Sequence, residues 1–287
     1  MRPNKVVRFS VPHTERELVR VQIDELPHFY DLVHQHSEIQ VMYIIKGEGT
    51  LLAGDFIGRF HEGQVYVLGS HQPHVFRCDK KYYNLKNKTT VKSISLYFDE
   101  TYGGDDLWNT NEWMEIKKFK QEASRGFAYT PEISKRAGEI IIQLASATGL
   151  NRLILFAQLL SVLSKSERKK ILSLQSHSLP QNEEERLNRI FAYTFRHFHR
   201  KVTLTEVADL AHLTIEAFCR YFKLHTRKTF IGFLQEVRIS NACRMLQQSG
   251  MSVEQISEAS GFNNLTHFNR TFKRLIKKTP RQYRKLF

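Results

Sequence analysis

The first third of the chain alternates short apolar runs with clusters of turn-forming residues. Strings rich in Val, Ile, Leu and Tyr are separated by Gly, Asp and Ser, a pattern typical of strands joined by tight turns. Many short strands at close and fairly regular spacing favour a barrel or a sandwich. The strands are expected at Ile39–Ile45, Thr50–Leu52, Gln64–Leu68 and Val91–Phe98.

From about residue 106 the apolar residues recur at intervals of three and four positions, which places them on one face of a helix. Helices are expected at Asp106–Ala123, Pro131–Ala147 and Leu150–Ser164. The polar stretch Ser164–Glu185, which contains Pro180, is interpreted as a linker. The chain beyond it is predicted to be helical to its end.

The C-terminal segment repeats itself with a period of about 50 residues. Two predicted capping boxes, Thr203-x-x-Glu206 and Ser252-x-x-Gln255, each begin a helix. A short turn follows each helix, and a second helix then begins after Thr214 or Asn264. Helix, tight turn and helix in two copies form a tandem helix-turn-helix layout, and two copies are too few for a solenoid of protein-binding repeats. The clearest repeated pairs are Phe218/Phe268, Arg220/Arg270, Phe222/Phe272, Lys223/Lys273, Lys228/Lys278 and Thr229/Thr279.

The second helix of each unit has an apolar face and a polar face when its residues are placed at 100° intervals. Arg can donate two hydrogen bonds to guanine, Asn and Thr can reach base edges, and Lys can meet phosphate. An Arg–Lys pair recurs at the same angle in both copies, which favours DNA readout over an ordinary solvated face. The candidate DNA contacts are Glu216, Cys219, Arg220, Lys223, Thr266, His267, Asn269, Arg270 and Lys273.

A further helix is predicted between the two units, over Phe230–Gln248, with Gly250 as its C-terminal cap. About 19 residues at about 1.5 Å each give a rod of roughly 28 Å. Successive major grooves on one face of DNA lie roughly 34 Å apart. One chain is therefore expected to place both units in successive grooves of double-stranded DNA. The rod's apolar stripe is expected to consist of Ile239, Ala242, Cys243 and Leu246.

The charge distribution agrees with a polyanion partner. The chain has 43 Lys and Arg against 29 Asp and Glu, and residues 183–287 hold 19 basic and 9 acidic residues, a surplus of ten. A localised basic surplus is typical of nucleic-acid binding, although a well-solvated surface is an alternative explanation of charge alone.

Cysteines and apolar stretches exclude several other classes of protein. Cys78, Cys219 and Cys243 have neither zinc-site spacing nor a disulfide framework. The first ten residues contain no apolar run, and the longest apolar stretch, Leu153–Leu163, is too short to span a bilayer. These features predict a cytoplasmic protein that has no membrane partner.

The C-terminal motifs resemble those of a known family. Ile256-x-x-x-x-Gly261-Phe262, Phe268-x-Arg270-x-Phe272-Lys273 and Thr279-Pro280-x-x-Tyr283-Arg284 are similar to the signature of the AraC/XylS family of bacterial transcription regulators. The match runs from about Leu204 to Lys285, and Ser257 stands where the family usually has Ala. The resemblance implies sequence-specific DNA binding, and it implies RNA polymerase as a further partner.

Residues 34–76 resemble a cupin barrel, which this family often carries at its N-terminus. The run His34-x-His36-x-x-x-Gln40 is similar to the first cupin motif, with Gln40 where metal-binding cupins have Glu. Tyr66 stands where the second motif's His ligand is expected. Alternate residues of a strand share one face, so several polar side chains are expected to point inward. The candidate effector-binding residues are His34, His36, Glu38, Gln40 and His74.

Three interpretations of this barrel remain open. It is a small-molecule sensor, a structural barrel in a ligand-independent regulator, or a metal-dependent cupin enzyme fused to a DNA-binding region. The missing Glu and His ligands argue against the enzyme, so we predict no catalytic residue, no metal and no cofactor.

The predicted fold class is α+β. A cupin-like β-barrel over residues 1–102 is followed by linker and dimerisation helices over 103–182, and an all-α domain with two helix-turn-helix units occupies 183–287. By resemblance, the middle helices are expected to form a homodimer interface, since a second pair of DNA-binding units would increase affinity.

Overall fold

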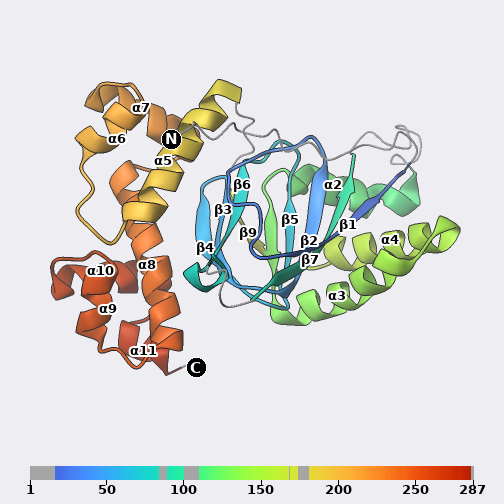
Figure 1. The fold of residues 1–287 in the computed structure, drawn as a ribbon. Helices are drawn as coiled ribbons and strands as arrows, with labels where there is room; N and C mark the ends of the chain where they lie inside the picture. Colours follow the sequence, from blue (N-terminus) through green and yellow to red (C-terminus); the bar gives the residue numbers. More distant parts are fainter. Residues whose placement is uncertain (1–16, 84–88, 100–109, 168, 174–180, 286–287) are drawn as a thin grey trace. The chain divides into compact units, whose positions relative to one another are not determined.

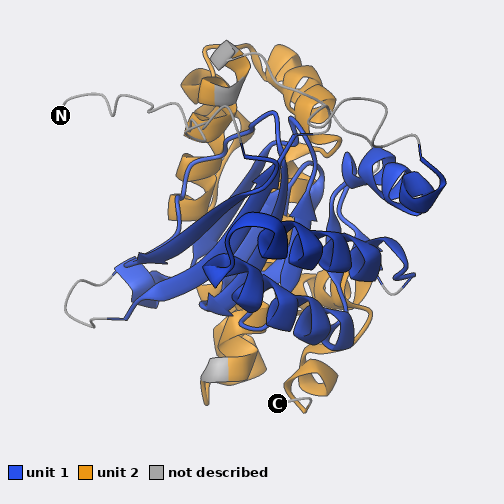
Figure 2. Ribbon diagram, turned by 90° about the vertical axis from the view of Figure 1, so that its right-hand side faces the viewer, with its two compact units in different colours: residues 1–179 blue, residues 180–287 orange. Residues whose placement is uncertain are grey.

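The computed structural model describes residues 17–83, 89–99, 110–167, 169–173 and 181–285. The chain divides into two compact units, residues 1–179 and 180–287 (Figure 2). The first unit contains strands and helices, whereas the described part of the second is helical (Figure 1). The α+β class and the all-helical C-terminal region are confirmed. No helix in the described ranges is long and apolar enough to cross a membrane.

The strands of the N-terminal unit include all four that the hydrophobic pattern predicts, each to within one residue at either end. Five further strands were not predicted, because their apolar runs are short or are interrupted by charged residues. The strands are β1 Arg20–Leu26, β2 Ile39–Lys46, β3 Gly49–Ala53, β4 Phe56–Phe60, β5 Val65–Leu68, β6 His74–Cys78, β7 Val91–Phe98, β8 Phe127–Tyr129 and β9 Lys169–Ile171.

These strands form two antiparallel sheets instead of the closed barrel that we expected. The larger sheet has the order β1-β7-β2-β5-β8-β9, and the smaller has the order β4-β3-β6. An isolated bridge joins His34, just before β2, to His74 in β6 through backbone hydrogen bonds of 3.0 and 2.9 Å. Within the described ranges no longer ladder joins the two sheets, so the cupin barrel is not confirmed.

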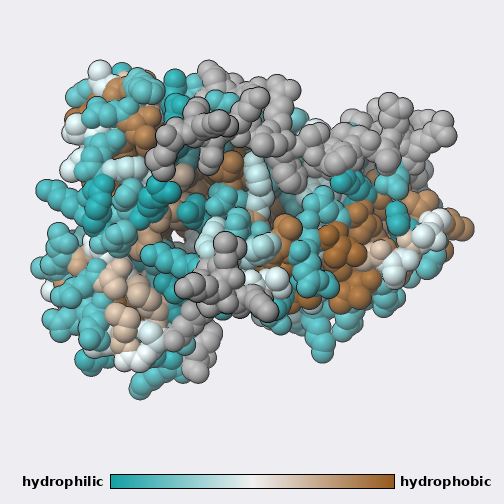
Figure 3. Space-filling model, viewed as in Figure 1, coloured by the Kyte–Doolittle hydropathy of each residue, from teal (hydrophilic) through white to brown (hydrophobic). Residues whose placement is uncertain are grey.

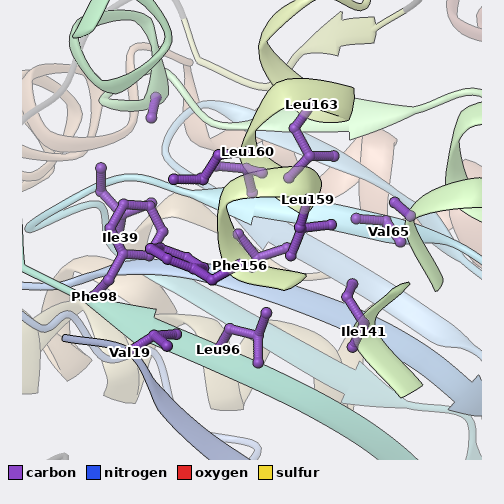
Figure 4. Close-up of a cluster of buried hydrophobic side chains, with 14 of the residues drawn as sticks. Val19, Ile39, Val65, Leu96, Phe98, Ile141, Phe156, Leu159, Leu160 and Leu163 are labelled. Atoms are coloured by element: carbon purple, nitrogen blue, oxygen red, sulfur yellow. The ribbon is translucent and has the colours of Figure 1, made fainter. Parts of the chain in front are cut away.

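Two long helices pack against the larger sheet. These are α3 (Pro131–Ser146) and α4 (Gly149–Ser164), both close to their predicted bounds. In Figure 4 the side chains of α4 lie over those of the strands and of Ile141. The helix predicted over Asp106–Ala123 is observed as α2 (Met114–Ala123), preceded by a short 3-10 turn at Asn111–Trp113. Residues 106–109 of that prediction lie outside the described ranges. A second 3-10 turn, Lys80–Tyr83, follows β6.

The predicted linker is wrong at both of its ends. Strand β9 lies inside Ser164–Glu185 and pairs with β8, and helix α5 begins at Gln181. The reason is burial, since Leu172, directly after β9, joins the apolar cluster between the sheets with an exposed fraction of 3%. Strand β9 and Leu172, which were predicted as linker, thus belong to the folded N-terminal unit.

The C-terminal unit consists of helices, and α8 has the predicted bounds. It ends differently from the prediction, because Gly250 provides no left-handed cap and Ser249 follows the helix in extended conformation (φ −131°, ψ 151°). The helices are α5 Gln181–His197, α6 Leu204–Leu210, α7 Ile215–Thr226, α8 Phe230–Gln248, α9 Val253–Ala259, α10 Leu265–Ile276 and α11 Pro280–Arg284.

Helix α8 contributes to the core of both helix-turn-helix units, α6–α7 and α9–α10. The first core is aromatic, with Phe233 of α8 at ring-centroid distances of 4.9 Å from Phe191 and 5.4 Å from Phe222. The second core packs the predicted apolar stripe of α8 against Phe268 and Phe272. The two helix-turn-helix units therefore share the single helix α8, as the sequence predicts.

Candidate nucleic-acid interface and histidine pocket

Side-chain caps fix the start of both recognition helices, α7 and α10. The Thr214 hydroxyl accepts a hydrogen bond from the Ala217 amide (3.2 Å), and the Asn264 side chain accepts one from the His267 amide (2.9 Å). Such caps satisfy backbone donors that a helix start leaves unpaired. Both helices end at left-handed residues fifty positions apart, Arg227 and Lys277. The repeat in the sequence is thus a repeat in backbone geometry.

The helices that precede the recognition helices are capped differently from one another. Ser252 and Gln255 form the reciprocal box that the sequence predicts. Thr203 accepts from the Glu206 amide, but the Glu206 carboxylate binds the hydroxyl of Tyr193 (2.8 Å) and the guanidinium of Arg200 (3.1 Å) instead of closing a box. Only half of the first predicted box is confirmed.

The predicted DNA-facing side chains lie on the exposed faces of the recognition helices. Phe218, Phe222, Phe268 and Phe272 are fully buried on the opposite faces. In the described ranges, no carboxylate lies within ion-pair distance of the Arg and Lys side chains of the predicted face, so all four are available to phosphate or bases. The exposed candidates are Glu216, Cys219, Arg220, Lys223, Thr266, Asn269, Arg270 and Lys273.

His267 differs from the other candidates because it is turned toward α8. Its side chain is half-buried, with Nε2 at 3.4 Å from the Gln235 side-chain nitrogen and its ring 5.6 Å from that of Phe262. The same Gln235 accepts a hydrogen bond from Arg274 (2.7 Å), an exposed cation of α10 that we did not predict. Gln235 of α8 thus contacts both His267 and Arg274 of α10.

Turn residues set the angle inside each helix-turn-helix unit. His212 occupies the first turn with φ 57°, and Gly261 occupies the second with φ 84°. A Cβ atom on Gly261 would lie 2.3 Å from the Phe198 carbonyl oxygen, which also accepts a hydrogen bond from Arg238 of α8 (2.8 Å). The second turn is therefore packed against the end of α5, and only Gly fits there.

In the N-terminal unit the five predicted effector residues are all buried. Their exposed fractions range from 1% for His74 to 8% for His34 and His36. The His74 ring centroid lies 4.4 Å from that of His34 and 5.1 Å from that of His36. The Gln40 amide nitrogen donates to the Ser95 hydroxyl (3.0 Å) and the Tyr97 hydroxyl (3.2 Å). The histidines and Gln40 therefore form one buried polar cluster.

A pocket of about 90 Å³ lies at this cluster. Three of the predicted residues, His34, Gln40 and His74, line it, whereas His36 and Glu38 do not. Four polar lining residues on two strands were not predicted, although they alternate there with apolar residues, and neither was Tyr30, which lies before β2. The four are Gln22 and Asp24 of β1 and Ser95 and Tyr97 of β7.

Burial determines the protonation of the cluster. Removal from water disfavours the charged form of an imidazole. It lowers the pKa of His34 to about 4, and it also lowers the pKa of His36 and of His74. The histidines are therefore neutral at pH 7.

Tyr66, which stands where a metal-binding cupin would have His, does not face this pocket. It is buried between the sheets, and its hydroxyl donates to the Gln64 side chain at 2.6 Å. Within the described ranges no group of three or more His, Cys, Asp or Glu residues has the arrangement of a metal site.

Known proteins match either the C-terminal unit or most of the chain. A family described as a helix-turn-helix domain matches residues 207–286. The uncharacterized HTH-type transcriptional regulator YdeC of Bacillus subtilis is 24% identical over 262 residues, which cover 90% of this chain and 87% of YdeC. The HTH-type transcriptional activator RhaS of Salmonella schwarzengrund is 32% identical over 152 residues, which cover 53% of this chain and 51% of RhaS.

The alignment thus spans about half the length of RhaS. Among solved structures, the DNA-binding domain of AdpA, described as a global transcriptional factor in complex with a target DNA, is 25% identical with a TM-score of 0.33, over 34% of this chain and 87% of that one. Residues 207–286 of the C-terminal unit thus match a helix-turn-helix domain, and the chain is similar to proteins described as transcriptional regulators, which supports a DNA-binding transcription regulator.

Proposed function

We propose that the chain binds a specific double-stranded DNA sequence through both recognition helices and that a small molecule in the N-terminal pocket controls this binding. The observation that carries the first part is the matched geometry of α7 and α10. Each presents an exposed Arg and an exposed Lys three residues later, at positions fifty apart, on a helix whose other face is buried in Phe.

We assign base readout to Arg220 and Arg270 and phosphate contacts to Lys223 and Lys273. An Arg near the middle of a recognition helix reaches guanine with two donors, whereas a Lys one turn later lies toward the backbone. Thr266 and Asn269 supply further groups for base edges in α10, and Glu216 can accept from cytosine in α7. The two helices are therefore expected to prefer different bases.

The second part of the proposal concerns a cupin-like sensor. A small pocket with convergent polar groups in an otherwise apolar unit is typical of a ligand site. Three of its lining residues, His34, Gln40 and His74, lie in residues 34–76, which resemble a cupin barrel, and all three are buried. Control of DNA binding requires that the ligand binds one state of the protein better than another.

We further propose a homodimer that forms through α3 and α4, with RNA polymerase as a later partner and the cytoplasm as the location. Several large apolar side chains on these helices are exposed, and the brown region over α3 and α4 in Figure 3 includes this surface. The most exposed are Leu150 (72%), Ile142 (50%) and Ile154 (49%). The division into residues 1–102, 103–182 and 183–287 remains part of this proposal.

Selection from a randomised DNA library tests the proposal directly. Each chain should specify two separate segments, so that a homodimer enriches two copies of this asymmetric pair. Binding should weaken steeply with salt because phosphate neutralisation releases counterions. Enrichment of a single short segment would mean that only one helix contacts bases. No enrichment over a library control would contradict sequence-specific binding.

A further inference from the structure

The ligand chemistry of the pocket follows from the tautomers of two of its histidines. His74 Nδ1 lies 2.7 Å from the Gln72 carbonyl oxygen, and His34 Nδ1 lies 2.9 Å from the Leu32 carbonyl oxygen. A carbonyl only accepts, so the ring proton of each neutral histidine is on Nδ1. Nε2 of each ring therefore carries a lone pair and acts as an acceptor.

The acceptor on His74 is both buried and unsatisfied. His74 has an exposed fraction of 1% and lines the pocket, and its Nε2 has no hydrogen-bond partner among the described residues. A buried polar atom without a hydrogen-bond partner is unfavourable, so a ligand that donates a hydrogen bond here is favoured.

The charge of the pocket has one sign. Asp24 is the only acidic side chain of the lining, which contains no Lys or Arg and whose histidines are neutral. The Gln22 amide nitrogen donates to both Asp24 carboxylate oxygens, at 2.9 and 3.1 Å, which holds the carboxylate in place. A ligand with a carboxylate would be repelled by the Asp24 carboxylate, because the lining has no Lys or Arg to offset the two negative charges.

Aromatic rings form much of the remaining wall. Phe29, Tyr30, Phe76 and Tyr97 line the pocket, and the Tyr30 ring lies 5.0 Å from that of His34. The faces of such rings attract a cation within about 6 Å. Acceptors, one carboxylate and aromatic walls together favour a positively charged donor.

We propose that this pocket binds a small primary ammonium compound, whose three N–H groups donate to the acceptors around His74 and whose charge is balanced by Asp24. This ligand class specifies the effector of the proposed function, and its role in controlling DNA binding rests on that proposed function. A cavity of about 150 Å³ holds benzene, so about 90 Å³ takes a fragment of roughly four non-hydrogen atoms, such as an aminoethyl group bearing one hydroxyl.

Three probes of nearly equal size separate charge from shape. Ethanolamine is cationic, ethylene glycol is neutral and glycolate is anionic at pH 7. Titration calorimetry of the full chain should show ethanolamine binding at least about tenfold more tightly than either of the others. Equal or tighter binding of ethylene glycol or glycolate, or binding of none of the three, would overturn the proposal.

Two matched variants test where the charge is sensed. Asp24→Asn keeps the side-chain shape and removes the carboxylate, and we expect it to weaken ethanolamine binding about tenfold or more while leaving ethylene glycol unchanged. Glu25→Gln, at an exposed neighbour on the same strand that pairs with Lys92 (3.0 Å), should leave both affinities unchanged. Unchanged ethanolamine binding by Asp24→Asn would remove Asp24 from the site and contradict the proposal.

DNA binding gives an independent measurement. If ethanolamine binds as expected and leaves the DNA affinity of the full chain unchanged, the ligand assignment stands and effector control fails. If ethylene glycol or glycolate changes DNA affinity while ethanolamine neither binds nor acts, effector control stands and the ammonium assignment fails.

Discussion

The two units of the chain use polar side chains in opposite ways. In the N-terminal unit, His34, His74 and Gln40 are enclosed between sheets and bonded to backbone or to neighbouring side chains. In the C-terminal unit, Arg220 and Arg270 stand on helix faces in contact with solvent. Burial shifts protonation in the first unit, whereas exposure leaves charge available to a polyanion in the second.

The two sites achieve selectivity by different physical means. A buried site discriminates because any ligand that leaves a polar atom unpaired incurs a desolvation cost. An exposed cationic face discriminates little by charge alone, so its specificity depends on the placement of a few forked donors. The first unit should therefore respond to pH, and the second should respond to salt.

The largest expected effect is acid destabilisation of the N-terminal unit. The unfolded His34 binds a proton below about pH 6.5, but in the folded state burial lowers its pKa to about 4. Stability is therefore present above pH 6.5 and is lost as pH falls toward 4, by on the order of 3 kcal/mol for this residue, with His74 acting in the same direction.

Tryptophan fluorescence reports the acid effect separately, because both tryptophans, Trp108 and Trp113, belong to the N-terminal unit. Urea unfolding followed by fluorescence should shift to lower urea between about pH 7 and about pH 5 by more than unfolding followed by the helical circular-dichroism signal, to which the helices of both units contribute. A fluorescence midpoint that does not move would show that these histidines are not buried in neutral form.

The second prediction compares the two turns within the C-terminal unit. Gly261→Ala introduces a Cβ atom 2.3 Å from the Phe198 carbonyl oxygen at φ 84°, and it should destabilise the unit by about 1–3 kcal/mol. His212→Ala is the control, since His212 already carries a Cβ atom at φ 57° and is exposed, and its effect should stay within about 0.5 kcal/mol.

Thermal unfolding followed by circular dichroism measures both turn variants. The tryptophan signal of the N-terminal unit should remain unchanged in each. Equal effects of the two substitutions would mean that the second turn relaxes away from α5.

The C-terminal unit was predicted well because its pattern is local. The spacing of four residues between Phe218 and Phe222 fixes the buried side of a helix within one segment. The exposed positions of Arg220 and Arg270 follow from that spacing alone. The prediction was wrong for the end of α8, where Gly250 provides no left-handed cap. It was also wrong for half of the first capping box, because the Glu206 carboxylate accepts a hydrogen bond from Tyr193 instead.

The N-terminal unit was predicted less completely because its pairs are distant in sequence. Gln22 and Ser95 face each other across β1 and β7, 73 positions apart, and neither motif nor spacing joins them. The number of sheets likewise depends on which strands pair. Hydrophobic alternation shows which face of a strand is buried, but it does not specify the strand's pairing partner. The histidines were found because their motif is local, whereas Asp24 was missed.

The exposed arginines of the two recognition helices should determine base preference. Arg220→Ala and Arg270→Ala should each weaken binding to the selected site by about 1–3 kcal/mol and relax base preference in separate segments. Competition against a randomised site library measures both quantities. A uniform loss of affinity with unchanged base preference would show that these side chains contact phosphate and that the helices are oriented differently.

The smallest expected effect concerns the two lysines. Lys223→Ala and Lys273→Ala should weaken binding to all sequences alike, because each removes one phosphate contact, and each should reduce the slope of log affinity against log salt by about 0.9. Lys92→Ala, in the N-terminal unit, is the matched control because its Nζ pairs with Glu25 and lies far in sequence from the recognition helices. Fluorescence anisotropy with a labelled duplex over a salt series gives the slopes. An unchanged slope in the two recognition-helix variants, or a reduced slope in the control, would mean that the basic surplus of residues 183–287 does not act through these positions.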